Sequence, residues 1–133
     1  MNVIVCVDDR MGMLFNHRRQ SRDQVLNDYL LSLRNHAVLR MNSYSAPLFA
    51  GAPNVMIQED FLNQAQQEDF CFVENTDLTP YEDRIRALII CRWNRSYPGD
   101  TCLTLDLKSY KLQYTDEFPG SSHEKITVEV YSK

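Results

Sequence analysis

Three strand-like segments follow one another without an intervening helix near the end of the chain: "TCLTLDL" (101–107), "YKLQYTDEF" (110–118) and "KITVEVY" (125–131). The turns beside them contain Gly99, Pro119 and Gly120, residue types that favour reversals of the chain. Strands joined by short turns pair in an antiparallel fashion. This stretch therefore predicts that the sheet of the protein ends in antiparallel strands.

The preceding part of the chain has a different pattern, in which apolar runs alternate with helix signals. Short continuous apolar runs are typical of strands that are covered on both faces of a sheet. The runs of this kind are "VIVCV" (3–7), "AVLRM" (37–41), "NVMI" (54–57), "FCFV" (70–73) and "ALIICRW" (87–93).

Helix signals separate several of these runs. Ser21 and Gln24 match a capping box, and an apolar stripe at helical spacing follows them. Asp60 predicts the start of a second helix that reaches about Gln66, and "TPYE" (79–82) predicts the start of a third, with the threonine as its cap. The apolar stripe of the first helix consists of Val25, Leu26, Tyr29, Leu30 and Leu33.

Alternating strands and helices followed by strands alone predict an α/β fold. We expect three layers: a mostly parallel sheet of about eight strands with antiparallel C-terminal strands, and helices on both faces. The 133 residues contain no internal repeat or linker, and a chain of this length can bury a core of its own. One domain over residues 1–133 is therefore expected.

Charge and apolar runs exclude several classes of protein. The formal net charge of −4 argues against a protein coated in nucleic acid, although it leaves room for a local basic patch. No apolar run approaches the roughly 20 residues that span a bilayer, and "MNVIVCVDDR" (1–10) lacks the basic start of a signal peptide. We expect a cytoplasmic protein without a membrane partner.

The four cysteines are far apart in the sequence and form no C-x-x-C pair. Three of them lie in apolar strand-like runs, where cysteine behaves as a small hydrophobic residue. We therefore expect reduced core thiols, with neither a bound metal nor a disulfide framework. The cysteines are Cys6, Cys71, Cys91 and Cys102.

The order of these elements, together with several short motifs, resembles the dihydrofolate reductase family. The tail matches best, with a "GDT" turn (99–101), an acidic segment with a tyrosine (106–110), a strand ending in Glu117-Phe118 and a closing strand (128–131). The start matches more loosely, through "VCVDDRMGM" (5–13) and "VLRMNSYS" (38–45). The resemblance implies the fold of that family over nearly the whole chain.

The departures from the family pattern concern its cofactor. The segment that should hold the phosphates of a dinucleotide is "FVENTDL" (72–78), which has no glycine and carries Glu74 and Asp77. The family's phosphate-reading arginine would fall at Ser43, and the loop "LFNHRRQSRD" (14–23) lacks the expected tryptophan and prolines. Asp23 is the nearest carboxylate to the family's acid. We therefore expect no nicotinamide cofactor and no ordinary reductase activity.

Ligands of open α/β sheets gather beyond the carboxyl ends of the parallel strands. The loops expected there are 8–23, 42–46 and 74–79, and they predict a site for a small anionic or nucleotide-like ligand, RNA or a protein partner. For "FNHRRQSRD" (15–23), a solvated loop and an anion clamp near a helix start both stay open. The candidate ligand-binding residues are Asn16, Arg18, Arg19, Asn42, Glu74, Asn75 and Thr76.

Two alternatives to simple ligand binding also stay open. The resemblance places the hairpin 119–127 beside the first long loop, so that His17 and His123 could act as base and acid in a metal-independent phosphodiesterase or ribonuclease, with Lys125 stabilising charge. The simpler interpretation of the two histidines is that they are exposed loop residues. The second alternative is an inhibitor or immunity-type module that binds a protein. The basic and aromatic segment 91–100 is interpreted as a strand whose tryptophan covers the edge of the core.

Overall fold

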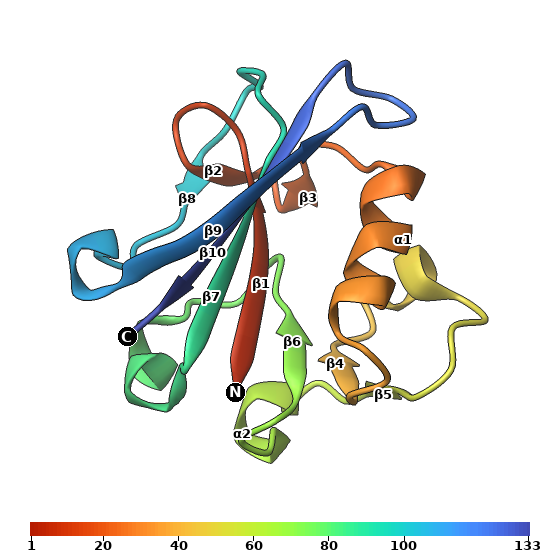
Figure 1. The fold of residues 1–133 in the computed structure, drawn as a ribbon, viewed down its shortest axis with the longest axis vertical. Helices are drawn as coiled ribbons and strands as arrows, with labels where there is room; N and C mark the ends of the chain where they lie inside the picture. Colours follow the sequence, from red (N-terminus) through yellow and green to blue (C-terminus); the bar gives the residue numbers. More distant parts are fainter.

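A computed structural model describes all of residues 1–133 and contains ten strands in two sheets (Figure 1). The strands are β1 (Asn2–Val7), β2 (Gly12–Phe15), β3 (Arg18–Arg19), β4 (Leu39–Met41), β5 (Val55–Ile57), β6 (Phe70–Phe72), β7 (Ala87–Arg92), β8 (Thr101–Cys102), β9 (Lys111–Phe118) and β10 (Ile126–Ser132). The helices are α1 (Gln24–Leu33) and α2 (Phe61–Gln64), with three 3-10 helices, η1 (Ala46–Phe49), η2 (Thr79–Arg84) and η3 (Leu107–Ser109).

The main sheet has seven strands in the order β5-β4-β6-β1-β7-β10-β9. The first five of these strands run parallel to their neighbours, whereas β10 pairs antiparallel with both β7 and β9. A smaller sheet, β3-β2-β8, lies beyond the carboxyl end of β1 (Figure 1). The α/β class and the antiparallel C-terminal strands are therefore confirmed.

Two apolar cores lie on the two faces of the main sheet, because neighbouring residues of a strand point to opposite faces. In β1, Val3 and Val5 belong to one core and Ile4 to the other. The Ile4 core includes Leu26 and Leu30 of α1. Both faces are thus covered, which explains the unbroken apolar character of the β1 sequence.

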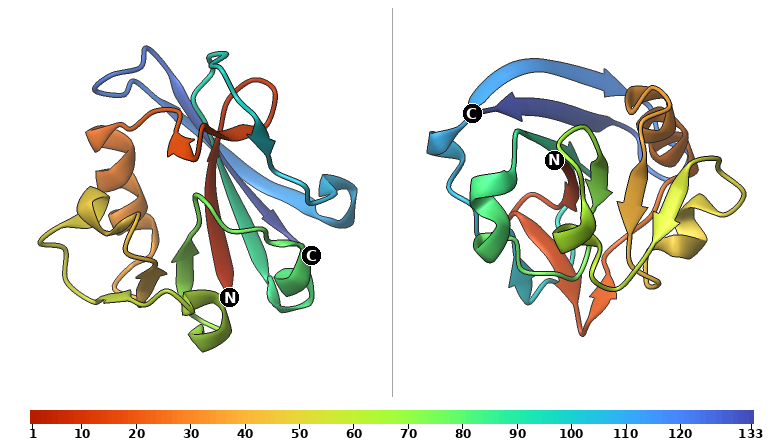
Figure 2. Two further views of the ribbon diagram at one scale, coloured as in Figure 1. Left: turned by 180° about the vertical axis from the view of Figure 1, so that it is seen from behind. Right: turned by 90° about the horizontal axis from the view of Figure 1, so that it is seen from below.

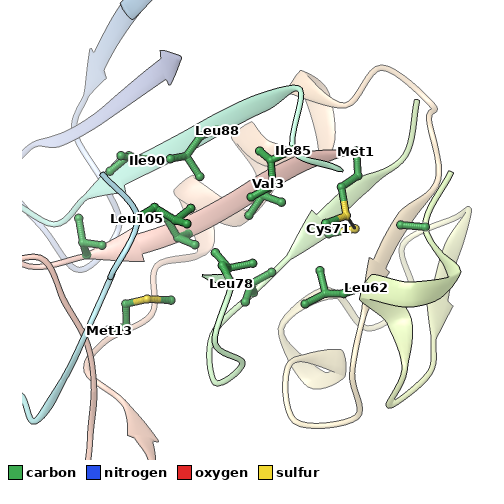
Figure 3. Packing of buried hydrophobic residues seen from close by; sticks show 14 of the residues in the cluster. Met1, Val3, Met13, Leu62, Cys71, Leu78, Ile85, Leu88, Ile90 and Leu105 are labelled. Carbon is green, nitrogen blue, oxygen red and sulfur yellow. Dashed lines mark hydrogen bonds between the residues drawn. The ribbon is translucent and has the colours of Figure 1, made fainter. Parts of the chain in front are cut away.

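The second core is covered by α2, by η2 and by the region of the small sheet (Figure 2). Val3 and Leu88 of the main sheet pack there with Leu62 from α2 and with Leu78 and Leu105 from the connecting segments (Figure 3). Helical elements therefore lie on both faces, as expected for a three-layer arrangement.

The start of α1 differs from the prediction. The N-cap is Asp23, whose Oδ1 accepts the N–H of Leu26 at 3.2 Å. The predicted capping box of Ser21 and Gln24 is wrong, because Ser21 lies outside the helix and its hydroxyl instead contacts His123. A carboxylate is a strong cap and also interacts favourably with the positive end of the helix.

Two other segments are less regular than predicted. The "TPYE" segment begins a 3-10 helix whose N-cap is Leu78, so the predicted threonine cap is wrong. The Asp77 carboxylate accepts the Thr79 N–H at 3.0 Å. Within 101–107 only Thr101–Cys102 form a strand, which pairs with β2, and Leu105 then turns into the core. The Asp77–Thr79 contact is local, whereas the turn of Leu105 into the core depends on distant segments that local spacing does not report.

The remaining general findings concern thiols and membrane-spanning segments. None of the four cysteines is in a disulfide; Cys71 and Cys91 are buried and Cys102 is exposed. Burial raises the pKa of the Cys71 thiol to about 12, so this thiol is un-ionised at neutral pH. None of the helices combines the length and the apolar character that crossing a membrane requires.

Candidate functional site

The small sheet, the tip of the β9–β10 hairpin and the loops after β1 and β6 gather at one end of the molecule (Figure 1). This is the carboxyl end of the parallel strands, where ligands bind in open α/β sheets. The predicted site residues lie in or next to these segments, in three separate groups.

The first group lies on a tight hairpin within segment 8–23, which was predicted from the sequence to be one long loop. Phe15 pairs with Arg18 and Leu14 with Arg19. The two residues of the turn, Asn16 and His17, have φ values of 53° and 62°, the left-handed conformation that a two-residue type I′ turn requires. His17 is therefore at the exposed tip of the turn.

A hollow of about 520 Å³ lies beside this hairpin, and we call it the Arg18 cavity. Arg18 is exposed and makes no ion pair or side-chain hydrogen bond in the structure. The Phe15 ring is 45 % exposed, and the volume falls within the usual range for small-molecule sites. The residues that line the cavity are Phe15, Asn16, Arg18, Arg19, Gln20, Tyr97 and Pro98.

Gln20 connects the wall of this cavity to the end of β1. Its Nε2 donates to Asp8 Oδ2 at 3.2 Å and to the Pro98 carbonyl at 3.3 Å. Its Oε1 is buried and has no hydrogen-bond partner. Buried carbonyl oxygens are nearly always satisfied by protein or water, so this atom is an exception in the wall of the cavity.

Arg19 is already engaged by an acid. Its guanidinium meets Glu74 through two hydrogen bonds, Nε–Oε2 at 2.9 Å and Nη2–Oε1 at 3.0 Å. Ser45 also donates to Glu74, at 2.7 Å, and the Arg19 guanidinium lies over the Tyr44 ring. The hydrogen bond to Glu74 outweighs burial and raises the pKa of Arg19. Two of the predicted ligand-binding residues therefore neutralise each other.

The other predicted ligand-binding residues surround a second hollow. Glu74, Asn75 and Thr76 line a cavity of about 140 Å³ that does not include Arg18. The amide of Asn42 donates to Asn75 Oδ1 at 2.8 Å. The predicted residues thus divide between two hollows, with Arg19 and Glu74 forming the link between them.

A third group surrounds His123, which lies in the β9–β10 turn. Its Nδ1 is 3.0 Å from Asp23 Oδ2, and both side chains are almost completely buried. Its Nε2 is 2.9 Å from the Tyr97 hydroxyl and 3.1 Å from Ser21 Oγ. The Trp93 ring stacks on the imidazole with the centroids 4.5 Å apart, so the segment 91–100 covers the core as interpreted from the sequence.

Asp23 joins the start of α1 to that turn. Its carboxylate accepts the backbone N–H groups of Ser121 at 3.0 Å and Ser122 at 2.8 Å, besides capping α1. Burial opposes ionisation, but the hydrogen bonds from His123 and from these N–H groups outweigh it and hold the pKa of Asp23 well below its usual range. In a neutral imidazole, an Nδ1–H that donates to the Asp23 carboxylate leaves Nε2 as an acceptor.

A solved structure has the same arrangement of strands and helices as this chain. A dihydrofolate reductase from Enterococcus faecalis, in complex with NADP(H) and RAB-propyl, matches 98 % of this chain and 94 % of its own, with a TM-score of 0.70 and 11 % identity. The chain has the dihydrofolate reductase fold. No protein-family model and no curated protein matches the sequence, so the similarity is one of fold.

The dihydrofolate reductase resemblance placed the hairpin 119–127 beside the first long loop, and the structure confirms that contact through Ser121, Ser122 and Asp23 (Figure 1). The structure places the predicted catalytic residues His17, His123 and Lys125 in different surroundings. His17 and His123 share none of the five main cavities, and Lys125 is exposed, with Glu117 at 3.5 Å. The two-histidine site stays a prediction.

Sequence reasoning did not include Ser21, Gln20 or Tyr97 among the candidates, and it named Asp23 only through the resemblance. One local signal for Asp23 was present, because aspartate directly before a helical stripe is a strong N-cap. No local signal pairs it with His123, which is 100 residues away. No cluster of three or more metal-ligating side chains is present.

Proposed function

We propose that the protein binds a small anionic, nucleotide-like ligand in the Arg18 cavity. The observation that carries the proposal is the unpaired Arg18 guanidinium on a wall that also carries aromatic rings. A guanidinium binds phosphate or carboxylate oxygens through two parallel hydrogen bonds. Arg18 makes no ion pair in a chain with a net charge of −4, although the Asp100 carboxylate accepts the N–H of the lining residue Asn16 at 3.0 Å.

The other lining groups favour a ligand that has a flat ring besides its charge. Phe15 exposes its ring at the rim, and the Tyr97 ring is covered by the Arg95 guanidinium at 5.6 Å. Aromatic rings of this kind stack on bases.

The nicotinamide dinucleotide bound by the similar reductase does not fit the corresponding residues of this chain. After β6 the chain carries Glu74 and Asp77 and no glycine, and it continues into a 3-10 helix of six residues. The Thr79 N–H at the start of this helix is already taken by the Asp77 carboxylate. Phosphate sites of this kind need free amides at a helix start and close approach of the backbone. We infer that this chain does not use that cofactor.

The proposal is tested by thermal unfolding in the presence of nucleoside monophosphates, short RNA and the reduced nicotinamide cofactor. A ligand at a hundred times its dissociation constant stabilises the folded state by about 2.7 kcal/mol. We expect nucleotides to stabilise the wild type, and Arg18→Ala to weaken their binding at least tenfold. Arg22→Ala is the matched control, because Arg22 is exposed in the same segment and lines none of the five main cavities.

Two results would contradict the proposal. Equal nucleotide binding by Arg18→Ala and the wild type would show that the nucleotide does not bind in the Arg18 cavity. An absence of stabilisation by any nucleotide or RNA would overturn ligand binding and favour the alternative of a protein-interaction module. Stabilisation by the reduced cofactor alone would overturn the inference about the dinucleotide.

A further inference from the structure

A hydroxyl, an imidazole and a carboxylate lie in a row beside the Arg18 cavity. Ser21 Oγ is 3.1 Å from His123 Nε2, and His123 Nδ1 is 3.0 Å from Asp23 Oδ2. A nucleophile within hydrogen-bond reach of a base, with the base oriented by a third group, is the general arrangement of an activated hydroxyl. Ligand binding requires neither of these two contacts.

We propose that Ser21 is the nucleophile of an esterase site, with His123 as its general base and Asp23 as the residue that positions the imidazole. The hydrogen bond between His123 Nδ1 and the Asp23 carboxylate, both side chains being almost completely buried, favours the tautomer that accepts a proton at Nε2. The stacked Trp93 prevents the ring from turning out of line.

A substrate would approach Ser21 from the Arg18 cavity. Ser21 is partly exposed and lines a small adjoining hollow of about 10 Å³, whose lining shares Arg19 and Gln20 with the Arg18 cavity. Its hydroxyl is 3.5 Å from that of Tyr97, which lines the Arg18 cavity. The substrate class is a small carboxylic ester that carries an anionic group. Its anionic character, unlike the reactivity of Ser21, rests on the proposed function.

The reaction needs only water as a second reactant. Ser21 Oγ forms a bond to the carbonyl carbon while its proton passes to His123 Nε2. The bond from that carbon to the alcohol oxygen then breaks, and the alcohol takes the proton from Nε2. A water molecule next attacks the carbonyl carbon of the acyl-serine and gives a proton to His123 Nε2. The bond from that carbon to Ser21 Oγ then breaks, Nε2 returns the proton to Ser21 Oγ, and the acid is released.

Tyr97 competes with Ser21 for the base. Its hydroxyl is 2.9 Å from His123 Nε2, which is closer than Ser21 Oγ. A test of the proposal must therefore separate the two hydroxyls. If Ser21 is the nucleophile, Tyr97→Phe leaves Ser21 as the sole hydroxyl partner of Nε2 and speeds its reaction.

The test is covalent labelling with an uncharged alkyl fluorophosphonate, followed by peptide mapping by mass spectrometry. The activated oxygen displaces fluoride and forms a bond to phosphorus, which marks the nucleophile. We expect one adduct, on Ser21. Labelling should be at least a hundred-fold slower in Ser21→Ala and His123→Gln, faster in Tyr97→Phe, and unchanged in Ser109→Ala, a remote exposed serine.

The role of Asp23 has a separate readout in the nitrogen NMR signals of the His123 ring. The wild type should show the proton on Nδ1. In Asp23→Asn the amide can donate to Nδ1, which moves the ring proton to Nε2 and abolishes labelling. An unchanged tautomer in a folded Asp23→Asn would overturn the positioning role.

The adduct in the wild type decides the proposal even if a variant fails to fold. No adduct, or an adduct on any residue other than Ser21, overturns it, and loss of labelling in Tyr97→Phe assigns the reactive hydroxyl to Tyr97. The uncharged probe keeps this result independent of nucleotide binding. Nucleotide binding without labelling overturns the esterase alone, whereas a labelled Ser21 without nucleotide binding overturns only the proposed function.

Discussion

Asp23 shows how a single residue can combine a structural and a chemical role. Its side chain is completely buried, yet it accepts hydrogen bonds from the α1 backbone, from two N–H groups of the β9–β10 turn and from His123. A buried carboxylate is tolerated only when it is paired and hydrogen-bonded in this way. The same contacts that hold α1 to the hairpin therefore also set the tautomer of the imidazole.

The first stability prediction is that Asp23→Asn lowers the free energy of unfolding by about 3 kcal/mol at pH 7, because the amide cannot accept all the hydrogen bonds that the buried carboxylate receives from His123 and from backbone N–H groups. The pKa of Asp23 is lower in the folded chain than the value of about 3.9 expected when unfolded. Its stabilisation is therefore complete above about pH 5 and is lost as the pH falls through the unfolded pKa towards the folded one. Urea unfolding at several pH values measures both effects.

The matched control for this prediction is Asp28→Asn, on the exposed side of α1, which should change stability by less than about 0.5 kcal/mol. The gap between the wild type and Asp23→Asn should narrow between pH 5 and pH 2. A gap that stays constant over that range would show that the charge of Asp23 contributes nothing.

At the scale of elements, two hairpins shape the site. The β2–β3 turn directs Arg18 to the cavity and places His17 at its tip. The β9–β10 turn brings His123 against α1, and Gly120 permits the approach, since a Cβ there would lie 2.3 Å from Asp23 Oδ2. The first hairpin thus lines the Arg18 cavity, the second positions His123, and each depends on residues suited to its turn.

We predict that His17→Gly stabilises the protein by about 0.5–1 kcal/mol. A non-glycine residue in the left-handed region costs about 1–2 kcal/mol, and the greater freedom of glycine in the unfolded chain offsets part of the gain. His17 has φ 62° and lies in the second position of the turn, where glycine after asparagine is preferred. The midpoint of chemical unfolding measures the change.

Ser96→Gly is the control, because Ser96 is an exposed loop residue without a positive φ, and it should destabilise the chain slightly. A loss of stability in His17→Gly would show that the imidazole makes a contact that offsets the strain. The same variant also tests the two-histidine prediction, since RNA cleavage that survived the loss of His17 would rule it out.

At the scale of the whole molecule, the two cores are joined through shared strands. Ile89 and Ile90 are neighbours in β7 but belong to opposite cores. The only tryptophan, Trp93, belongs to the Ile89 core. Because β1 and β7 run through both cores, disruption of either core should unfold the entire chain in one transition.

We predict that Ile89→Ala and Ile90→Ala each lower stability by about 2–5 kcal/mol, the usual range for a buried isoleucine. Tryptophan fluorescence and far-ultraviolet circular dichroism should report the same midpoint for both variants. Val25→Ala, at a side chain 39 % exposed, is the control. A fluorescence midpoint that Ile90→Ala leaves unchanged would show that the two cores unfold separately.

The strands and the fold class followed from local patterns. Runs such as "VIVCV" and "ALIICRW" are apolar throughout because β1 and β7 are buried on both faces. The strand-only ending likewise predicted the antiparallel β9 and β10. The apolar pattern of a segment does not depend on which other segments pack against it, so it can be interpreted from the sequence alone. Helix boundaries were less secure, as Asp23 rather than Ser21 caps α1.

The site depended on tertiary contacts. The sequence presents Arg18 and Arg19 as equivalent, yet folding pairs Arg19 with Glu74, 55 residues away, and leaves Arg18 free. It presents His123 as a loop histidine, yet folding buries it between Asp23 and the hydroxyls of Ser21 and Tyr97. Local spacing determines which residues face a core, whereas the charge and reactivity of a side chain depend on neighbours that only the folded chain brings within a few ångströms.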